Sequence, residues 1–205
     1  MKKSLLLVLG LAASAAALQV QADGDANAGS SKATVCMACH GPGGNSVSGQ
    51  FPKLAGQNAS YIAEQLANFK AGKRQNPIMQ PQAQKLSDQD MQDLAAYFSS
   101  QTVTTGEAQA GQVKQGESLY RNGNVASNVP ACEACHSPDG AGNAAMKVPA
   151  LAGQHAEYVV AQLQNYANGS RTTDPNKMME TIASRLTPAE MQAVASYIEG
   201  LHRAQ

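Results

Sequence analysis

Apolar side chains recur at helical spacing in two separate parts of the chain. Those spaced by four and then three residues are Ile62, Leu66 and Phe69 in the first part, and Val159, Leu163 and Tyr166 in the second. This spacing places them on one face of an amphipathic helix, and Gly72 and Gly169 follow where such a helix would stop. No segment reads convincingly as a strand. The pattern therefore predicts an all-α fold.

A second amphipathic helix closes each part. Its predicted start is a capping box, Ser87-Asp88-Gln89-Asp90 in one part and Thr187-Pro188-Ala189-Glu190 in the other. Met91 and Met191 lie on its apolar face, so core packing explains both methionines. A further helix is expected before each cysteine motif, near 26–34 and near 112–120.

The two parts are copies of one unit. Short matches recur at a separation that drifts from 96 to 100 residues: Cys36 with Cys132, Leu54-Ala55-Gly56-Gln57 with Leu151-Ala152-Gly153-Gln154, Arg74 with Arg171, and Met79 with Met179. Two copies indicate two tandem domains related by internal duplication rather than a solenoid. We expect a first domain at 23–98, a polar linker at 99–110 and a second domain at 111–205.

The first 22 residues have the pattern of a secretory signal peptide. Lys2 and Lys3 precede an apolar stretch, and Val20-Gln21-Ala22 is a small-residue cleavage site. The stretch is shorter than the ~20 residues of a membrane span, although an uncleaved anchor is the alternative. The whole chain has 15 Lys+Arg and 15 Asp+Glu, so losing both lysines with the signal leaves a formal charge of −2. There is no basic stripe, and nucleic acid is not an expected partner.

The candidate chemistry lies in a pentapeptide that occurs twice, Cys36-Met37-Ala38-Cys39-His40 and Cys132-Glu133-Ala134-Cys135-His136. Cys-X-X-Cys-His is the spacing of covalent c-type haem attachment, in which two thiols bind the porphyrin and the histidine ligates its iron. The sequence thus predicts two covalently bound haem c groups. The predicted attachment residues are Cys36, Cys39, Cys132 and Cys135, and the predicted iron ligands are His40 and His136.

Two disulfides, or a zinc site, are the competing interpretations of these four cysteines. Export favours disulfides in general, but a disulfide within Cys-X-X-Cys closes a very small loop and stabilises little. Zinc ligands would be crowded into five residues. A domain of under 100 residues with 4% aromatic side chains has a thin core, which a haem would fill. Haem is therefore the favoured interpretation, and poor folding is expected without it.

A methionine is the expected second ligand of each iron. The duplication leaves two pairs to choose from: Met79 with Met179, and Met91 with Met191. Met79 is the better candidate because it lies in a segment, 76–81, that is expected to be a loop with two prolines. Met179 stands seven residues before a leucine, as Met79 does, which favours it over the adjacent Met178.

The remaining histidines, His155 and His202, have no histidine counterpart in the other copy. We therefore expect exposed or helix-end positions for both, and no haem ligation.

Together these residues resemble the cytochrome c4 family, periplasmic dihaem cytochromes of bacterial respiration. The resemblance covers the predicted mature chain and rests on both Cys-X-X-Cys-His motifs, the element Phe51–Gln57, the Pro77-Ile78-Met79 segment and the run Ser196–His202. It implies two small cytochrome c domains packed about a pseudo-twofold axis, with the haem propionate edges facing each other. It also implies that the carbonyls of Pro52 and Pro149 accept a hydrogen bond from the proximal histidines.

Outer-sphere electron transfer, not enzyme catalysis, is the expected function. The resemblance implies that electrons arrive from a cytochrome bc complex or a soluble donor and leave to a terminal oxidase, in the periplasm and through weak docking. Peripheral association with the membrane stays open.

One alternative is a dihaem electron-accepting subunit of a flavocytochrome dehydrogenase. Another is a dihaem peroxidase, which the paired methionines and the short chain disfavour. Lys53 in one copy stands where Ala150 stands in the other, so the two haem potentials are expected to differ.

Overall fold

The computed structural model describes residues 23–203, and the predicted signal peptide at 1–22 lies outside the described residues. The first domain contains α1 (Ala26–Lys32), α2 (Thr34–His40), α3 (Ala59–Lys70), α4 (Met79–Gln84) and α5 (Asp88–Ser99). The second repeats the set as α6 (Val113–Asn122), α7 (Glu133–His136), α8 (Ala156–Ala167), α9 (Met178–Ala183) and α10 (Pro188–Gly200). Short 3-10 turns lie at Pro42–Gly44, Val125–Ser127 and Pro175–Lys177.

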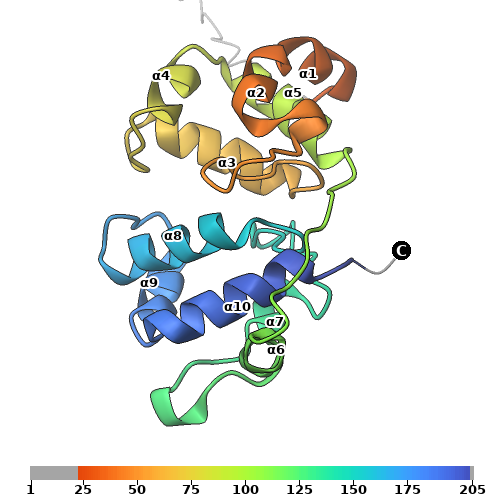
Figure 1. Cartoon of the computed structure of the whole chain (residues 1–205). Coiled ribbons are helices and arrows are strands. Elements are labelled where there is room, and N and C mark those ends of the chain that lie inside the picture. Colours follow the sequence, from red (N-terminus) through yellow and green to blue (C-terminus); the bar gives the residue numbers. More distant parts are fainter. Residues whose placement is uncertain (1–22, 204–205) are drawn as a thin grey trace, which may run out of the picture.

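The two domains lie one above the other, with α3 and α8 on the sides that face each other (Figure 1). Residues 23–203 contain no β-strand, only isolated bridges between Asn124 and Val129 and between Asn143 and Val148. The predicted all-α, two-domain architecture is confirmed. None of the helices in this described part is long and apolar enough to cross a membrane.

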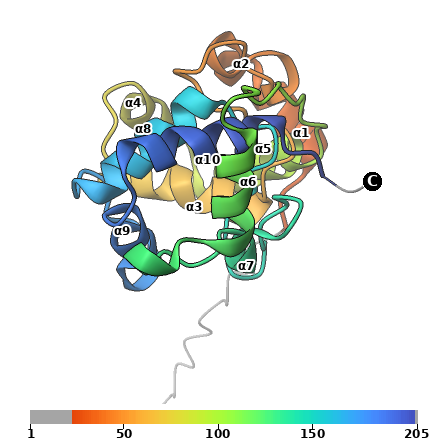
Figure 2. The same cartoon turned by 60° about the horizontal axis from the view of Figure 1, so that its bottom comes forward.

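Each domain is built on a crossing of its first and last helices. In the first domain α1 packs on α5, and in the second α6 packs on α10 (Figure 2). Glycine makes the close approach of the second pair possible, because a Cβ atom on Gly116 would lie only 2.2 Å from the carbonyl oxygen of Ala193. The packing of α6 on α10 therefore sets the position from which the chain continues to the second cysteine motif.

Both predicted capping boxes are present. Ser87 Oγ accepts a hydrogen bond from Asp90 N at 3.1 Å, and the Asp90 carboxylate accepts one from Ser87 N at 2.9 Å. Thr187 and Glu190 make the same reciprocal pair at the start of α10. These bonds satisfy backbone donors that a helix start otherwise leaves unpaired.

Each domain has a core of its own. Leu94 and Phe98 of α5 lie in the first core, and Val194 and Ile198 of α10 lie in the second. The methionines predicted to pack in these cores are buried as well, Met91 with 4% and Met191 with 5% of their surface exposed.

The segment around Met79 departs from the predicted loop. Met79 is the first residue of the short helix α4, although Pro81 follows two positions later. Proline is tolerated there because the amide groups of the first turn have no acceptor within the helix. The prediction of an irregular segment was therefore wrong for Met79 itself, and its counterpart Met179 also lies in a short helix, α9.

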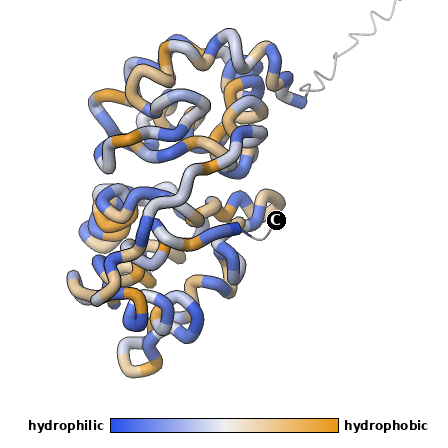
Figure 3. The backbone as a smooth tube through the Cα atoms, turned by 45° about the vertical axis from the view of Figure 1, so that its right-hand side comes forward, coloured by the Kyte–Doolittle hydropathy of each residue, from blue (hydrophilic) through white to orange (hydrophobic). Residues whose placement is uncertain are grey.

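The segment from α5 to α6 runs along both domains (Figure 3), coloured mostly as neutral to hydrophilic. Hydrogen bonds fix it at several points. Asn45 Nδ2 donates to Thr102 O at 2.9 Å, and Lys53 Nζ donates to Thr104 O at 2.6 Å. Gly106 N donates to Glu199 O of the second domain at 3.1 Å, so this segment contacts both domains and forms part of their interface.

Candidate haem sites

The two motif histidines occupy matching buried positions. His40 ends α2 and His136 ends α7, and they are 5% and 8% exposed. Nδ1 of His40 lies 2.8 Å from Pro52 O, and Nδ1 of His136 lies 3.0 Å from Pro149 O. A carbonyl oxygen only accepts hydrogen bonds, so Nδ1 carries the proton in both rings.

The environment keeps these rings neutral. Burial lowers the pKa of His40 and of His136, and the proline carbonyl bond opposes this only in part. A neutral ring protonated at Nδ1 has its lone pair on Nε2. Each histidine can thus ligate a metal through Nε2, and the hydrogen bond from Nδ1 to the proline carbonyl fixes the orientation of the ring.

The four cysteines form no disulfide with one another. Burial raises the pKa of the Cys36 thiol, and it raises the pKa of the Cys132 thiol to about 11. Neither is therefore a thiolate at neutral pH. Within residues 23–203 no group of three or more His, Cys, Asp or Glu side chains is placed to hold a metal ion. Each motif thus presents two cysteines beside a histidine whose Nε2 is available as a ligand, which is the set of residues that covalent haem attachment uses.

The two candidate methionines occupy matching places at the starts of short helices. Asn76 Oδ1 accepts a hydrogen bond from Met79 N at 2.9 Å, and Asp174 Oδ2 accepts one from Met179 N at 2.5 Å. Met179 packs against the second core, whereas Met178 is 44% exposed. In the first domain α2, which ends in His40, and α4, which begins with Met79, are separate helices set apart in the fold (Figure 1).

An interdomain network of polar side chains was not predicted. Its members are Tyr61, Gln65 and Arg74 from the first domain and their counterparts Tyr158, Gln162 and Arg171 from the second. Each arginine donates to both glutamines and to the tyrosine of the opposite domain. All six recur in the duplication, and that recurrence of polar residues was the available signal.

The arginines of this network are buried cations without a carboxylate partner. Arg74 is 9% exposed and Arg171 is 5% exposed, and neither forms an ion pair within residues 23–203. Nε of Arg171 has no hydrogen-bond partner. Burial alone would raise the pKa of Tyr158, but the two guanidinium groups outweigh it and lower that pKa. A buried cation normally has an anionic partner, and the carboxylates of two haem propionates fit this requirement.

His155 also lies at the interface. It caps the start of α8, as expected of a helix-end histidine, but its side chain is only 12% exposed. Its Nε2 lies 2.9 Å from Ser46 O of the other domain, and its Nδ1 lies 3.5 Å from Glu199. The helix-end alternative therefore holds for His155, but its contacts with the other domain were not predicted, because sequence periodicity does not report contacts between domains. His202 is exposed.

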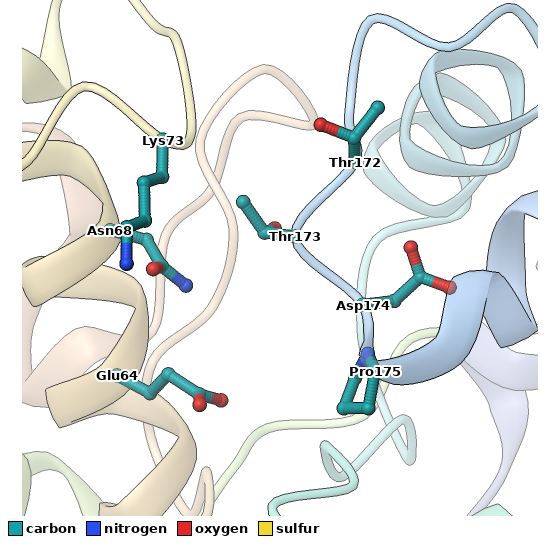
Figure 4. A pocket seen from close by; sticks show the side chains of 7 residues that line it. All are labelled: Glu64, Asn68, Lys73, Thr172, Thr173, Asp174 and Pro175. Carbon is teal, nitrogen blue, oxygen red and sulfur yellow. The ribbon is translucent and has the colours of Figure 1, made fainter.

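A polar cleft of about 400 Å³ opens between the domains near the second methionine segment (Figure 4). Glu64, Asn68 and Lys73 face the residues 172–175 across it. Substrate pockets are mostly apolar and enclosed, whereas this cleft gives water access to the edge of the interface.

Helical domains that each present a buried, Nδ1-bonded histidine directly after a Cys-X-X-Cys pair define the class of c-type cytochromes, here with two sites. The cytochrome c family model matches residues 26–102 and again residues 113–202.

Known proteins narrow the class. Cytochrome c4 of Pseudomonas aeruginosa is 48% identical over 200 residues, which cover 97% of this chain and 97% of that protein. The crystal structure of reduced recombinant cytochrome c4 from Pseudomonas stutzeri matches with a TM-score of 0.85 at 44% identity, covering 87% of this chain and 100% of that one. A thiosulfate dehydrogenase electron acceptor of Stutzerimonas stutzeri is 42% identical over 171 residues, 80% of this chain and 78% of that protein.

The chain belongs to the cytochrome c4 family. It is an electron-transfer protein rather than an enzyme, and it binds two covalently attached haem c groups, as the doubled motif predicted.

Proposed function

We propose that the chain is exported, loses its first 22 residues, and works in the periplasm as an electron carrier between the respiratory chain and a terminal oxidase. Its donor is a cytochrome bc complex or a soluble redox protein. The observation that carries this proposal is the matched pair of buried histidines, each fixed through Nδ1 by a proline carbonyl. Rigid ligation changes little between two oxidation states, which suits rapid outer-sphere transfer.

The proposed attachment residues are Cys36 and Cys39 in the first domain and Cys132 and Cys135 in the second. The proposed iron ligands are His40 with Met79, and His136 with Met179. Each bound haem supplies a one-electron Fe(III)/Fe(II) couple. The half-buried setting of Met179 supports it over the exposed Met178, and the hydrogen bonds to the amides of Met79 and Met179 hold both helix starts in place.

Replacing Met79 tests the ligand assignment. Met79→Ala removes the proposed sulfur ligand, so one haem should lose the near-infrared charge-transfer band of histidine–methionine ligation, and its potential should fall. Met91→Ala is the matched control. It removes a core methionine, so it should reduce the free energy of unfolding by about 2–5 kcal/mol and leave the band intact. The assignment is wrong if Met91→Ala abolishes the band and Met79→Ala does not.

A second candidate function is that of electron acceptor to a dehydrogenase. The similarity to a thiosulfate dehydrogenase electron acceptor favours a thiosulfate dehydrogenase as the donor over the flavocytochrome dehydrogenase that was the alternative from the sequence. Stopped-flow reduction separates the possibilities. The oxidised protein is mixed with a reduced cytochrome bc complex, a thiosulfate dehydrogenase with thiosulfate, or a reduced flavoprotein dehydrogenase. Reduction by the first alone supports the respiratory carrier, and reduction by either dehydrogenase alone replaces it.

A further inference from the structure

The peptide behind each buried histidine is bound by a glutamine from the opposite domain. In the second domain, the Pro149 carbonyl that accepts from His136 belongs to the same peptide group as the Ala150 amide. That amide donates to Gln57 Oε1 of the first domain at 2.8 Å, and Gln57 Nε2 donates to Ala150 O at 2.9 Å.

The same arrangement occurs in the first domain. Pro52 O accepts from His40, and the Lys53 amide of that peptide donates to Gln154 Oε1 of the second domain at 2.9 Å. Gln154 Nε2 donates to Lys53 O, also at 2.9 Å. The duplicated chain therefore contains two crossed chains of hydrogen bonds, each running from a histidine ring through one peptide to a glutamine of the other domain.

Both glutamines are fixed by a turn that the duplicated element Leu-Ala-Gly-Gln forms. Gln57 N donates to Leu54 O at 3.1 Å, with Gly56 at a φ of +65°, and Gln154 repeats this turn with Gly153 at +73°. The third position of such a turn needs positive φ, which explains the glycine. The glutamine that follows is aimed across the interface.

The side-chain amides have one orientation only. Gln57 Oε1 faces two donors, the amides of Ala150 and Asn58, while Nε2 faces a carbonyl. If the side-chain amide of Gln57 were flipped, its NH₂ group would face the two backbone N–H donors, and its oxygen would face a carbonyl. With 8% of Gln57 and 7% of Gln154 exposed, water does not replace these bonds readily.

We propose that Gln57 and Gln154 are positioning residues that set the electron donation of the proximal histidine in the opposite domain. When an acceptor binds the N–H end of a peptide, it makes the carbonyl end a stronger acceptor. A stronger bond at Nδ1–H makes the imidazole more basic and stabilises Fe(III). Gln57 thereby lowers the potential of the second haem and Gln154 that of the first. This inference rests on the proposed function, in which His40 and His136 ligate iron.

The test is a pair of reciprocal substitutions in the dihaem protein, Gln57→Met and Gln154→Met. Methionine keeps the side-chain length and removes the acceptor. The potential of each haem is measured by redox titration, with each couple assigned by NMR of its axial methionine methyl group. Gln57→Met should raise the potential of the second haem, and Gln154→Met that of the first. Loss of one hydrogen bond corresponds to about a threefold to tenfold change in the reduction equilibrium, and tenfold is about 59 mV for one electron.

Two further variants separate this effect from a looser interface. Asn58→Ala removes the bonds from Asn58 Nδ2 to Val148 O at 2.8 Å and Ala141 O at 3.3 Å, but it leaves both glutamine bonds intact, so neither potential should move. Gln57→Glu keeps an acceptor oxygen for the Ala150 amide. The NMR signal of His136 Nδ1–H should therefore shift upfield in Gln57→Met and not in Gln57→Glu.

Shifts that are equal at both haems, or that occur at the haem of the substituted domain, overturn the inference. So does an upfield shift in both Gln57 variants. None of these outcomes affects the proposed function, because two reversible couples that exchange electrons with the respiratory partners would still be present. Loss of those couples in the unsubstituted protein would instead contradict the proposed function itself.

Discussion

Replacing Arg171 tests whether the interdomain arginines serve the haem groups or only the interface. Arg171 donates to Tyr61 Oη at 2.7 Å, to Gln162 at 2.9 Å and to Gln65 at 3.1 Å. In Arg171→Met both glutamine oxygens keep their bonds to Arg74, at 2.8 and 3.0 Å. Only the Tyr61 hydroxyl loses its charged partner.

The protein contacts alone therefore predict a modest loss. One hydrogen bond to a charged group contributes about 1.5–3 kcal/mol. The guanidinium of Arg171 also lies 4.5 Å from the centroid of the Tyr166 ring, a contact of about 1–2 kcal/mol. The substitution also ends the repulsion between the buried guanidinium groups of Arg74 and Arg171, which offsets part of both losses. The net loss in the free energy of unfolding is then about 2 kcal/mol. If a haem propionate is the anion that pairs with Arg171, the substitution leaves this propionate buried without its partner, which adds about 3–5 kcal/mol to the loss.

Denaturant unfolding of the dihaem protein distinguishes the two cases. We expect Arg171→Met to reduce the free energy of unfolding by about 5 kcal/mol or more. It should also lower at least one haem potential, because a nearby positive charge favours Fe(II). Arg121→Met is the control. Arg121 is 41% exposed and pairs with Glu117 at 3.1 Å and Glu133 at 3.3 Å, so its replacement should change the free energy of unfolding little, because exposed ion pairs contribute little. A loss of only about 2 kcal/mol for Arg171→Met with unchanged potentials would refute the propionate pairing.

Two further substitutions test the scaffold. Gly116→Ala should destabilise the second domain by about 1–2 kcal/mol in denaturant unfolding, because a clash of about 1–3 kcal/mol with the backbone of Ala193 exceeds the helix propensity gain of about 1 kcal/mol. Gly111→Ala is the control, since no atom lies within 4 Å of the added carbon, and it should change stability by less than about 0.5 kcal/mol. Equal effects of the two substitutions would contradict the close packing of α6 on α10 at Gly116. The hydrogen bond from Lys32 lowers the pKa of Asp93 to about 2. The stabilisation from this bond is therefore complete above the unfolded pKa of about 3.9 and is lost as the pH falls toward 2. Acid unfolding of Asp93→Asn should lack this dependence, and an identical profile in both proteins would rule out the bond between Lys32 and Asp93 as its cause.

Local features of the chain were predictable because their causes are local. The capping boxes at Ser87 and Thr187 depend on residues three positions apart, and Met91 and Met191 follow a helical period that the cores then confirm. The duplication was visible because the same side chains recur. Met79 shows the limit of a local rule, since a proline two positions into a helix does not prevent the helix.

Contacts between the domains were not predictable in the same way. Gln57 and Arg74 were visible only as repeated residues, since their partners in the opposite domain lie 84 to 93 positions away. A period or a motif describes one element at a time, whereas these bonds depend on how two complete domains face each other. Repetition of a polar residue in a duplicated chain is thus a signal for the interface as well as for the individual site.

The duplicated halves differ in charge at one end of their interface. Lys53, His155 and Glu199 correspond to Ala150, Asn58 and Ser99 in the opposite copy, so three charged or titratable groups replace neutral ones.

These groups lie together around the peptide behind His40. Lys53 contributes the amide of that peptide, burial lowers the pKa of its side chain, and Glu199 opposes this shift. His155 bonds to Ser46, whose hydroxyl donates to Phe51 O at 2.6 Å, one residue before Pro52. The crossed glutamine bonds are symmetric, but the charges around them are not. A common scaffold thus places the two haem groups in different electrostatic environments, and this is a physical reason for the expected difference between their potentials.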